Sequence, residues 1–129
     1  MAGWDDLVSF VRMRYEVMRQ SDDELWFNLP IGEERTQLVA VRRVTGEDDH
    51  PWAQITSPVG SIDKIDLAEL LTLAGETVAG GAVAEDRLVL FRHSVPLGEI
   101  ALDGFDRPFR LVVETADRLE HALTGADEH

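Results

Sequence analysis

The sequence predicts the α+β class, with helices packed on an antiparallel sheet, and three observations lead to this prediction. Amphipathic helical stripes occupy both ends of the chain. Runs rich in β-branched and aromatic residues, separated by short polar turns, fill most of the middle. The run at residues 87–95 is the densest, and both of its faces begin apolar, which is typical of a central strand. A chain of 129 residues, 44% of them hydrophobic, is expected to form one domain over residues 1–129.

The first element is expected to be an amphipathic helix over residues 4–19, because apolar residues recur there at steps of three and four. The stripe consists of Trp4, Leu7, Val8, Val11, Tyr15 and Met18. Acidic residues in its first turn and Arg19 in its last turn both suit the helix dipole.

Three strands are expected next, at residues 24–29, 36–45 and 52–57, with Pro58 ending the third. The connections between these strands are short. Consecutive strands with short connections pair as an antiparallel meander.

A short helix is expected after Asp66, which is a good N-cap and has Glu69 three residues later, as in a capping box. Gly75 is a suitable stop. Apolar residues surround this helix almost completely, and such a helix has to be buried on all sides. It is therefore either sandwiched within its own domain or placed between the sheet and a partner protein. The candidate protein-binding or dimer-interface residues are Leu67, Leu70, Leu71, Leu73 and Ala74.

A β-hairpin over residues 78–95 follows, with the polar pair Glu85 and Asp86 between its strands. The last helix is expected over residues 106–123, with Asp106 as a cap and a regular apolar stripe. The predicted order is therefore α-β-β-β-α-β-β-α.

Composition excludes several kinds of site. The chain has no cysteine, which rules out disulfides, thiol catalysis and cysteine-based metal centres. This composition fits a cytoplasmic protein. The N-terminus does not resemble a signal peptide, and no apolar run is long enough to span a membrane.

The net charge of −13 disfavours nucleic-acid binding, because the phosphate backbone would be repelled. Two interpretations of the acidity are open. It keeps the protein in solution, or it favours a basic segment of a partner.

No motif of known catalytic, phosphate-binding or dinucleotide-binding function is present, so we expect no enzyme activity and no cofactor. Residues 47–50 are the best metal-like cluster, but consecutive side chains in a turn rarely converge on one ion, and we predict a solvated turn without metal. Arg42, Arg43 and Arg92 lie on expected strands, where they either pair with acidic residues or offer a polar end to a bound chain.

Several segments together resemble a known family. They are the amphipathic first helix, the strand at residues 25–30, the meander ending at 52–58, the short apolar helix, the hairpin ending at 88–96, and the closing helix around 112–119. The pattern is similar to the YbjN-type proteins and to the type III secretion chaperones that share their fold. This resemblance implies a small, acidic, cytoplasmic, non-enzymatic protein that is often a homodimer. The chaperones bind an extended segment of a partner protein.

Two function hypotheses follow. The first is a chaperone-like module that binds a peptide or protein, by groove binding or strand addition. The second is a small-molecule sensor with a pocket between the sheet and the helices, which Trp26, Trp52 and Phe91 could line. Core packing is the alternative role of these three aromatic residues.

Overall fold

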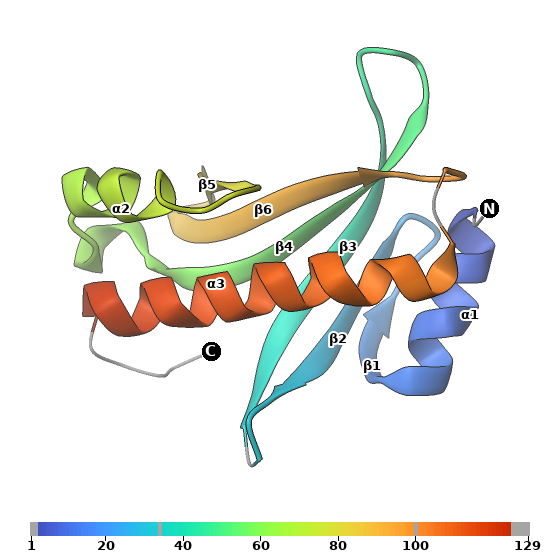
Figure 1. Ribbon diagram of the computed structural model, residues 1–129, viewed down its shortest axis with the longest axis horizontal. Helices are drawn as coiled ribbons and strands as arrows, with labels where there is room; N and C mark the ends of the chain where they lie inside the picture. Colours follow the sequence, from blue (N-terminus) through green and yellow to red (C-terminus); the bar gives the residue numbers. More distant parts are fainter. Residues whose placement is uncertain (1–2, 34, 100, 125–129) are drawn as a thin grey trace.

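The computed structural model describes residues 3–33, 35–99 and 101–124, and it has the predicted α+β architecture (Figure 1). The sheet has six antiparallel strands in the order β1-β2-β3-β4-β6-β5. The helices are α1 (Trp4–Arg14), α2 (Leu67–Ala74) and α3 (Asp106–Thr124), with short 3₁₀ turns at Ile62–Lys64 and Leu102–Phe105. The strands are β1 (Glu16–Gln20), β2 (Glu24–Ile31), β3 (Arg35–Thr45), β4 (Pro51–Ser61), β5 (Gly81–Glu85) and β6 (Leu88–Pro96).

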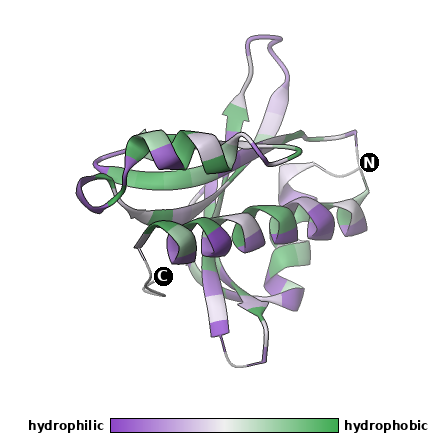
Figure 2. Cartoon of the chain, turned by 60° about the vertical axis from the view of Figure 1, so that its left-hand side comes forward, coloured by the Kyte–Doolittle hydropathy of each residue, from purple (hydrophilic) through white to green (hydrophobic). Residues whose placement is uncertain are grey.

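Helix α3 runs along the length of the molecule and covers one face of the sheet, while α1 and α2 lie toward opposite ends of it (Figure 1). The apolar stripe of α3 is the predicted one. Its buried members are Phe109, Val112, Val113, Ala116 and Leu119. The polar residues of α3 alternate with this stripe, as the colouring of Figure 2 shows. The core therefore lies between α3 and the inner face of the sheet.

The first helix is shorter than predicted. It ends at Arg14, and residues 16–20 form strand β1, which pairs with β2. Tyr15 fits a helical stripe by spacing, but it is extended and its hydroxyl donates to Asp106 of α3 at 3.0 Å. Its ring also stacks on Phe27 of β2, with centroids 5.3 Å apart. Tertiary contacts thus override the helical periodicity at this point.

Strand β4 does not end at Pro58, contrary to the prediction, but continues to Ser61 through a register shift. The β3–β4 ladder stops at the pair Ala40–Thr56, so the missing N–H of Pro58 leaves no gap in it. Beyond that pair, side chains join the strands instead. Buried Gln37 donates its Nε2 to Ser57 Oγ and to the Pro58 carbonyl, each at 3.1 Å, and Ser57 Oγ donates to the Leu38 carbonyl at 2.6 Å.

Helix α2 begins and ends as predicted. The Asp66 carboxylate accepts from the backbone N–H groups of Ala68 and Glu69, and Gly75 is the C-cap. The β5–β6 turn consists of Asp86 and Arg87, one residue later than predicted, and both have positive φ, 49° and 66°. Two successive positive φ values are the signature of a type I′ hairpin turn.

The two edges of the sheet differ. Edge strand β1 carries charged residues and a register irregularity between Val17 and Arg19. Edge strand β5 has the sequence Gly-Ala-Val-Ala-Glu, with only small or apolar side chains before its final Glu85. Charges and bulges protect an edge from pairing with another chain, so β1 is protected and most of β5 is not.

Candidate functional site

The candidate site is the outer face of the sheet, opposite α3. Among the described elements, none of the three helices packs on this face. Side chains alternate along β2, where Leu25 and Phe27 are buried toward α3 and Trp26 between them is only partly buried. The strand registers place Trp26 beside Ala40 of β3, and Ala40 beside Thr56 of β4. Three strands thus contribute one row of outer-face residues.

This face is hollowed into a groove of about 450 Å³. Its floor and walls are mostly apolar and come from β2, β3, β4 and β6: Trp26, Leu38, Ala40, Thr56, Pro58, Leu88 and Leu90. Its rim is charged: Arg19, Glu24, Arg42, Glu85 and Asp86. An apolar centre within a polar rim is the usual composition of a binding surface.

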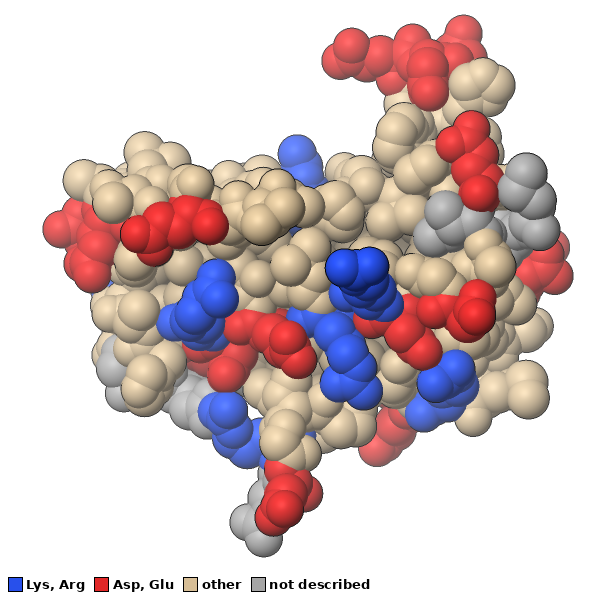
Figure 3. Space-filling view, in the orientation of Figure 1, with Lys and Arg blue, Asp and Glu red and all other residues tan. Residues whose placement is uncertain are grey.

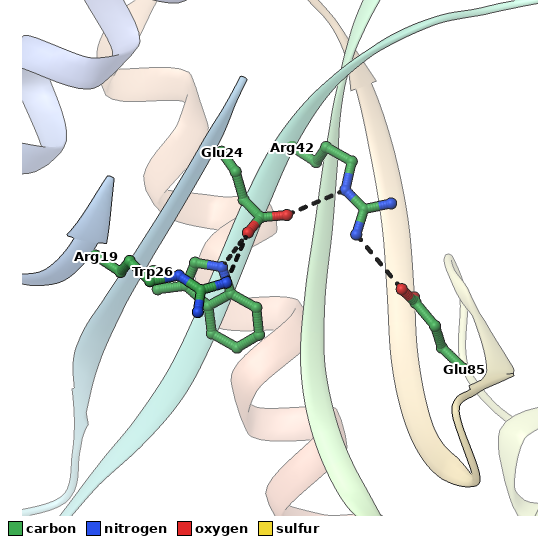
Figure 4. Close-up of polar contacts among 5 residues, drawn as sticks. All are labelled: Arg19, Glu24, Trp26, Arg42 and Glu85. Atoms are coloured by element: carbon green, nitrogen blue, oxygen red, sulfur yellow. Dashed lines mark hydrogen bonds and ion pairs between the residues drawn. The ribbon is translucent and has the colours of Figure 1, made fainter. Parts of the chain in front are cut away.

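Glu24 is the centre of the rim (Figure 4). It lies directly opposite Arg42 in the β2–β3 register, and its Oε2 accepts from Arg42 Nε at 3.3 Å. Its Oε1 accepts from the indole N–H of Trp26 and from Arg19 Nη2, the latter at 3.3 Å. The guanidinium of Arg19 also lies 5.1 Å above the Trp26 ring. The hydrogen bond from Trp26, followed by those from the two arginines, lowers the pKa of Glu24 below its ordinary value despite partial burial.

Arg42 also reaches Glu85 at the end of β5, with its Nη2 3.4 Å from Glu85 Oε1 (Figure 4). Strands β4 and β6 lie between β3 and β5 in the sheet. For this contact to form, the sheet has to curl so that the end of β5 approaches β3 across the outer face. The Arg42–Glu85 pair therefore spans the groove. Arg43, one residue on, points elsewhere and pairs with Asp23 at 2.7 Å.

The three aromatic residues considered for a pocket are not brought together. Trp26 lines the groove, whereas Phe91 is fully buried in the core. Trp52 lies near the β3–β4 turn, beside a second, shallower hollow, and its indole N–H donates to Asp48 at 3.1 Å. That hydrogen bond is the main cause that lowers the pKa of Asp48.

The described residues cover helix α2 on one side only, which does not match the alternative in which it is sandwiched within its own domain. Leu70 is buried, and Leu73 and Ala74 are partly buried. Leu67 and Leu71, by contrast, are 47% and 69% exposed. The outward side of α2 is thus an apolar surface that no described part of the chain covers (Figure 2).

Acidic residues concentrate at the tip of the protruding β3–β4 hairpin, where Figure 3 shows a red cluster. Glu47, Asp48 and Asp49 are all exposed there, as expected of a solvated turn. Within the described ranges, no group of three or more histidine, cysteine or acidic residues could hold a metal ion. None of the described helices is long and apolar enough to cross a membrane.

Apart from Trp26, the residues of the groove floor were not predicted as a site. One signal was present, because Leu88 and Leu90 make the second face of β6 apolar as well as the first. A strand that is apolar on both faces needs a cover on each, and the described structure supplies one cover only.

No protein-family model matches the chain, and a search of curated proteins gives no match.

Proposed function

We propose that this protein is a non-enzymatic, cytoplasmic binding module that holds an extended segment of a partner protein on the outer face of its sheet. The observation that carries the proposal is the apolar groove on a sheet face that no described helix covers. Burying apolar surface is the dominant favourable contribution to most protein–protein association. The resemblance to YbjN-type proteins and secretion chaperones, drawn from the sequence, points to the same kind of function.

We also propose that the protein forms a homodimer through α2. The support is the exposure of Leu67 and Leu71, two large apolar side chains one turn apart on the same helix. Val78, in the connection that follows α2, is a further fully exposed apolar side chain. A contiguous exposed apolar patch commonly marks an interaction site.

The second candidate is a small-molecule sensor, and the size of the groove favours it. A volume of about 450 Å³ falls within the range of ligand pockets, about 300–1,000 Å³. In this case the ligand would lie against Trp26 on the outer face rather than between the sheet and the helices.

The main test is a peptide-binding experiment in which the NMR signal of a tryptophan in the groove reports where the peptide binds. A diverse array of synthetic peptides is probed with labelled protein, and each binder is titrated into ¹⁵N-labelled protein. Three tryptophan indole signals are available, and Trp26 is the one in the groove. Binding in the groove shifts the Trp26 signal and leaves that of Trp4, which is buried, in place.

Matched variants localise the binding. Leu90→Gln in the groove should abolish it, and Leu71→Gln on α2 should leave it intact, with both variants checked by thermal melting. Peptides that shift only α2 residues would contradict the assignment of the surface. If no peptide binds but a metabolite panel shifts the Trp26 signal, the sensor replaces the peptide-binding module.

The dimer is tested separately by analytical ultracentrifugation. The Leu67→Glu/Leu71→Glu double variant should sediment as a monomer. Met13→Glu on α1 is the control, because Met13 is 87% exposed and lies on another helix. A wild-type monomer, or a double variant with unchanged mass, would contradict the proposed interface.

A further inference from the structure

The acidic residues of the groove rim differ in how many hydrogen bonds and ion pairs their carboxylates already make. Glu24 already accepts hydrogen bonds from Trp26, Arg19 and Arg42. Among the described residues, the Glu85 carboxylate makes an ion pair with Arg42 alone. Asp86 makes no ion pair with any described residue, although it lines the same groove. The carboxylates of Glu85 and Asp86 are therefore the ones open to a ligand.

The Arg42–Glu85 pair is easily replaced. Its N–O distance is 3.4 Å, and the two side chains are 45% and 51% exposed. Pairs of this exposure contribute little to stability. If Arg42 released Glu85, it would keep its partner Glu24 at 3.3 Å.

The β5–β6 turn also contains an arginine, Arg87, whose guanidinium is directed away from the groove. Arg87 follows Asp86, but its guanidinium pairs with Asp63, and its carbonyl accepts from the Ile62 N–H at 2.9 Å. The type I′ turn, with positive φ at both central residues, fixes this arrangement. Arg87 thus does not neutralise the two carboxylates beside it.

An apolar floor adjoins these carboxylates. Leu88 follows the turn directly, Leu90 lies two residues further on the same face, and Pro58 is the register partner of Leu90. A ligand that used both features would carry a cationic side chain next to an apolar one. The net charge of −13 would also attract such a ligand at long range.

From this geometry, and resting on the proposed function, we propose that the groove selects a basic, apolar peptide segment. A lysine or arginine of the segment binds Glu85 and Asp86 and displaces Arg42 from Glu85, while the neighbouring apolar side chain rests on Leu88 and Leu90. Glu24 remains bound to Trp26 and holds the released Arg42.

The test compares two short synthetic peptides, one that alternates leucine with lysine and one in which each lysine is replaced by glutamine. Their affinities are measured by fluorescence anisotropy for the wild type and for Glu85→Gln/Asp86→Asn. Asparagine tolerates the positive φ at position 86. The control is Glu47→Gln/Asp49→Asn at the hairpin tip, which changes the net charge equally but lies outside the groove.

We expect the wild type to bind the lysine peptide roughly threefold more tightly, because two exposed ion pairs form with Glu85 and Asp86 while the Arg42–Glu85 pair is lost. This preference should shrink in high salt. The groove variant should lose this preference, and the control should keep it. Equal binding of both peptides would overturn this inference and leave the proposed function standing. An equal loss in the control would also overturn it, since net charge alone would then explain the preference. Failure of both peptides, and of every peptide in the array, would refute the proposed function as well.

Discussion

Replacing Glu24 with glutamine tests the charged rim most directly. Glu24→Gln keeps the size of the side chain and its hydrogen bond from Trp26, but it removes the negative charge that Arg19 and Arg42 face. A hydrogen bond to a charged group contributes about 1.5–3 kcal/mol, against about 1 kcal/mol for a neutral one. The two arginines are 71% and 45% exposed, so each ion pair adds only about 0–1 kcal/mol. We therefore expect the variant to be about 1–2 kcal/mol less stable at pH 7.

The deficit should depend on pH with a definite sign. Because the folded protein lowers the pKa of Glu24, ionised Glu24 stabilises the fold fully above its unfolded pKa of about 4.3. That stabilisation is lost as the pH falls through the lower, folded pKa. At the acid end of this window, the wild type and Glu24→Gln should unfold with nearly the same free energy.

The assay is urea unfolding at pH 7 and at pH 3, followed by tryptophan fluorescence and circular dichroism together. Glu47→Gln serves as the control, because Glu47 is exposed at the hairpin tip and makes no ion pair with a described residue. A Glu24 variant as stable as the wild type at pH 7 would refute the reasoning. So would a deficit that stays the same size at pH 3.

Two further predictions concern the packing. Tyr15→Phe should lower the unfolding free energy by about 1 kcal/mol at pH 7, since it removes the 3.0 Å hydrogen bond to Asp106. Burial and that bond raise the pKa of Tyr15, so the wild type, unlike the variant, should lose stability as the pH rises above about 10. Urea titrations at alkaline pH would then show the difference in unfolding free energy between the two proteins becoming smaller. Gly80→Ala should cost about 3 kcal/mol or more by thermal melting, because its Cβ would lie 2.7 Å from the Phe91 ring at φ +85°. Gly32→Ala, also at positive φ but in open space, should cost only about 1 kcal/mol, and equal losses would contradict the packing argument.

Local chemistry made several elements of this fold predictable from sequence. Asp66 and Gly75 bound α2 in the structure as their residue types suggest, and the stripe of α3 is buried where its period places it. Strand β1 was missed because Tyr15 and Met18 continue the helical spacing of Val11. The contacts that Tyr15 makes in its extended conformation, with Asp106 and with Phe27, join residues distant in the chain, and no local pattern shows them.

The candidate site was much less predictable, because it depends on register and on the curl of the sheet. The pair Glu24–Arg42 follows from the β2–β3 register, which no local pattern specifies. The pair Arg42–Glu85 joins residues 43 positions apart, on strands that are not neighbours. The sequence left open whether the domain itself covers Leu67 and Leu71, because composition shows that α2 is apolar but not how much of it the domain covers.

The difference between the two sheet edges bears on aggregation. A chain with two unprotected edges can add copies at both and grow into a fibre. Here β1 is charged and irregular, so further copies could pair only along β5. Edge-to-edge association would then end at two copies, since joining two β5 strands leaves a protected β1 at each end of the combined sheet. Pairing through the sheet edges alone therefore gives a closed pair of copies rather than an open-ended fibre.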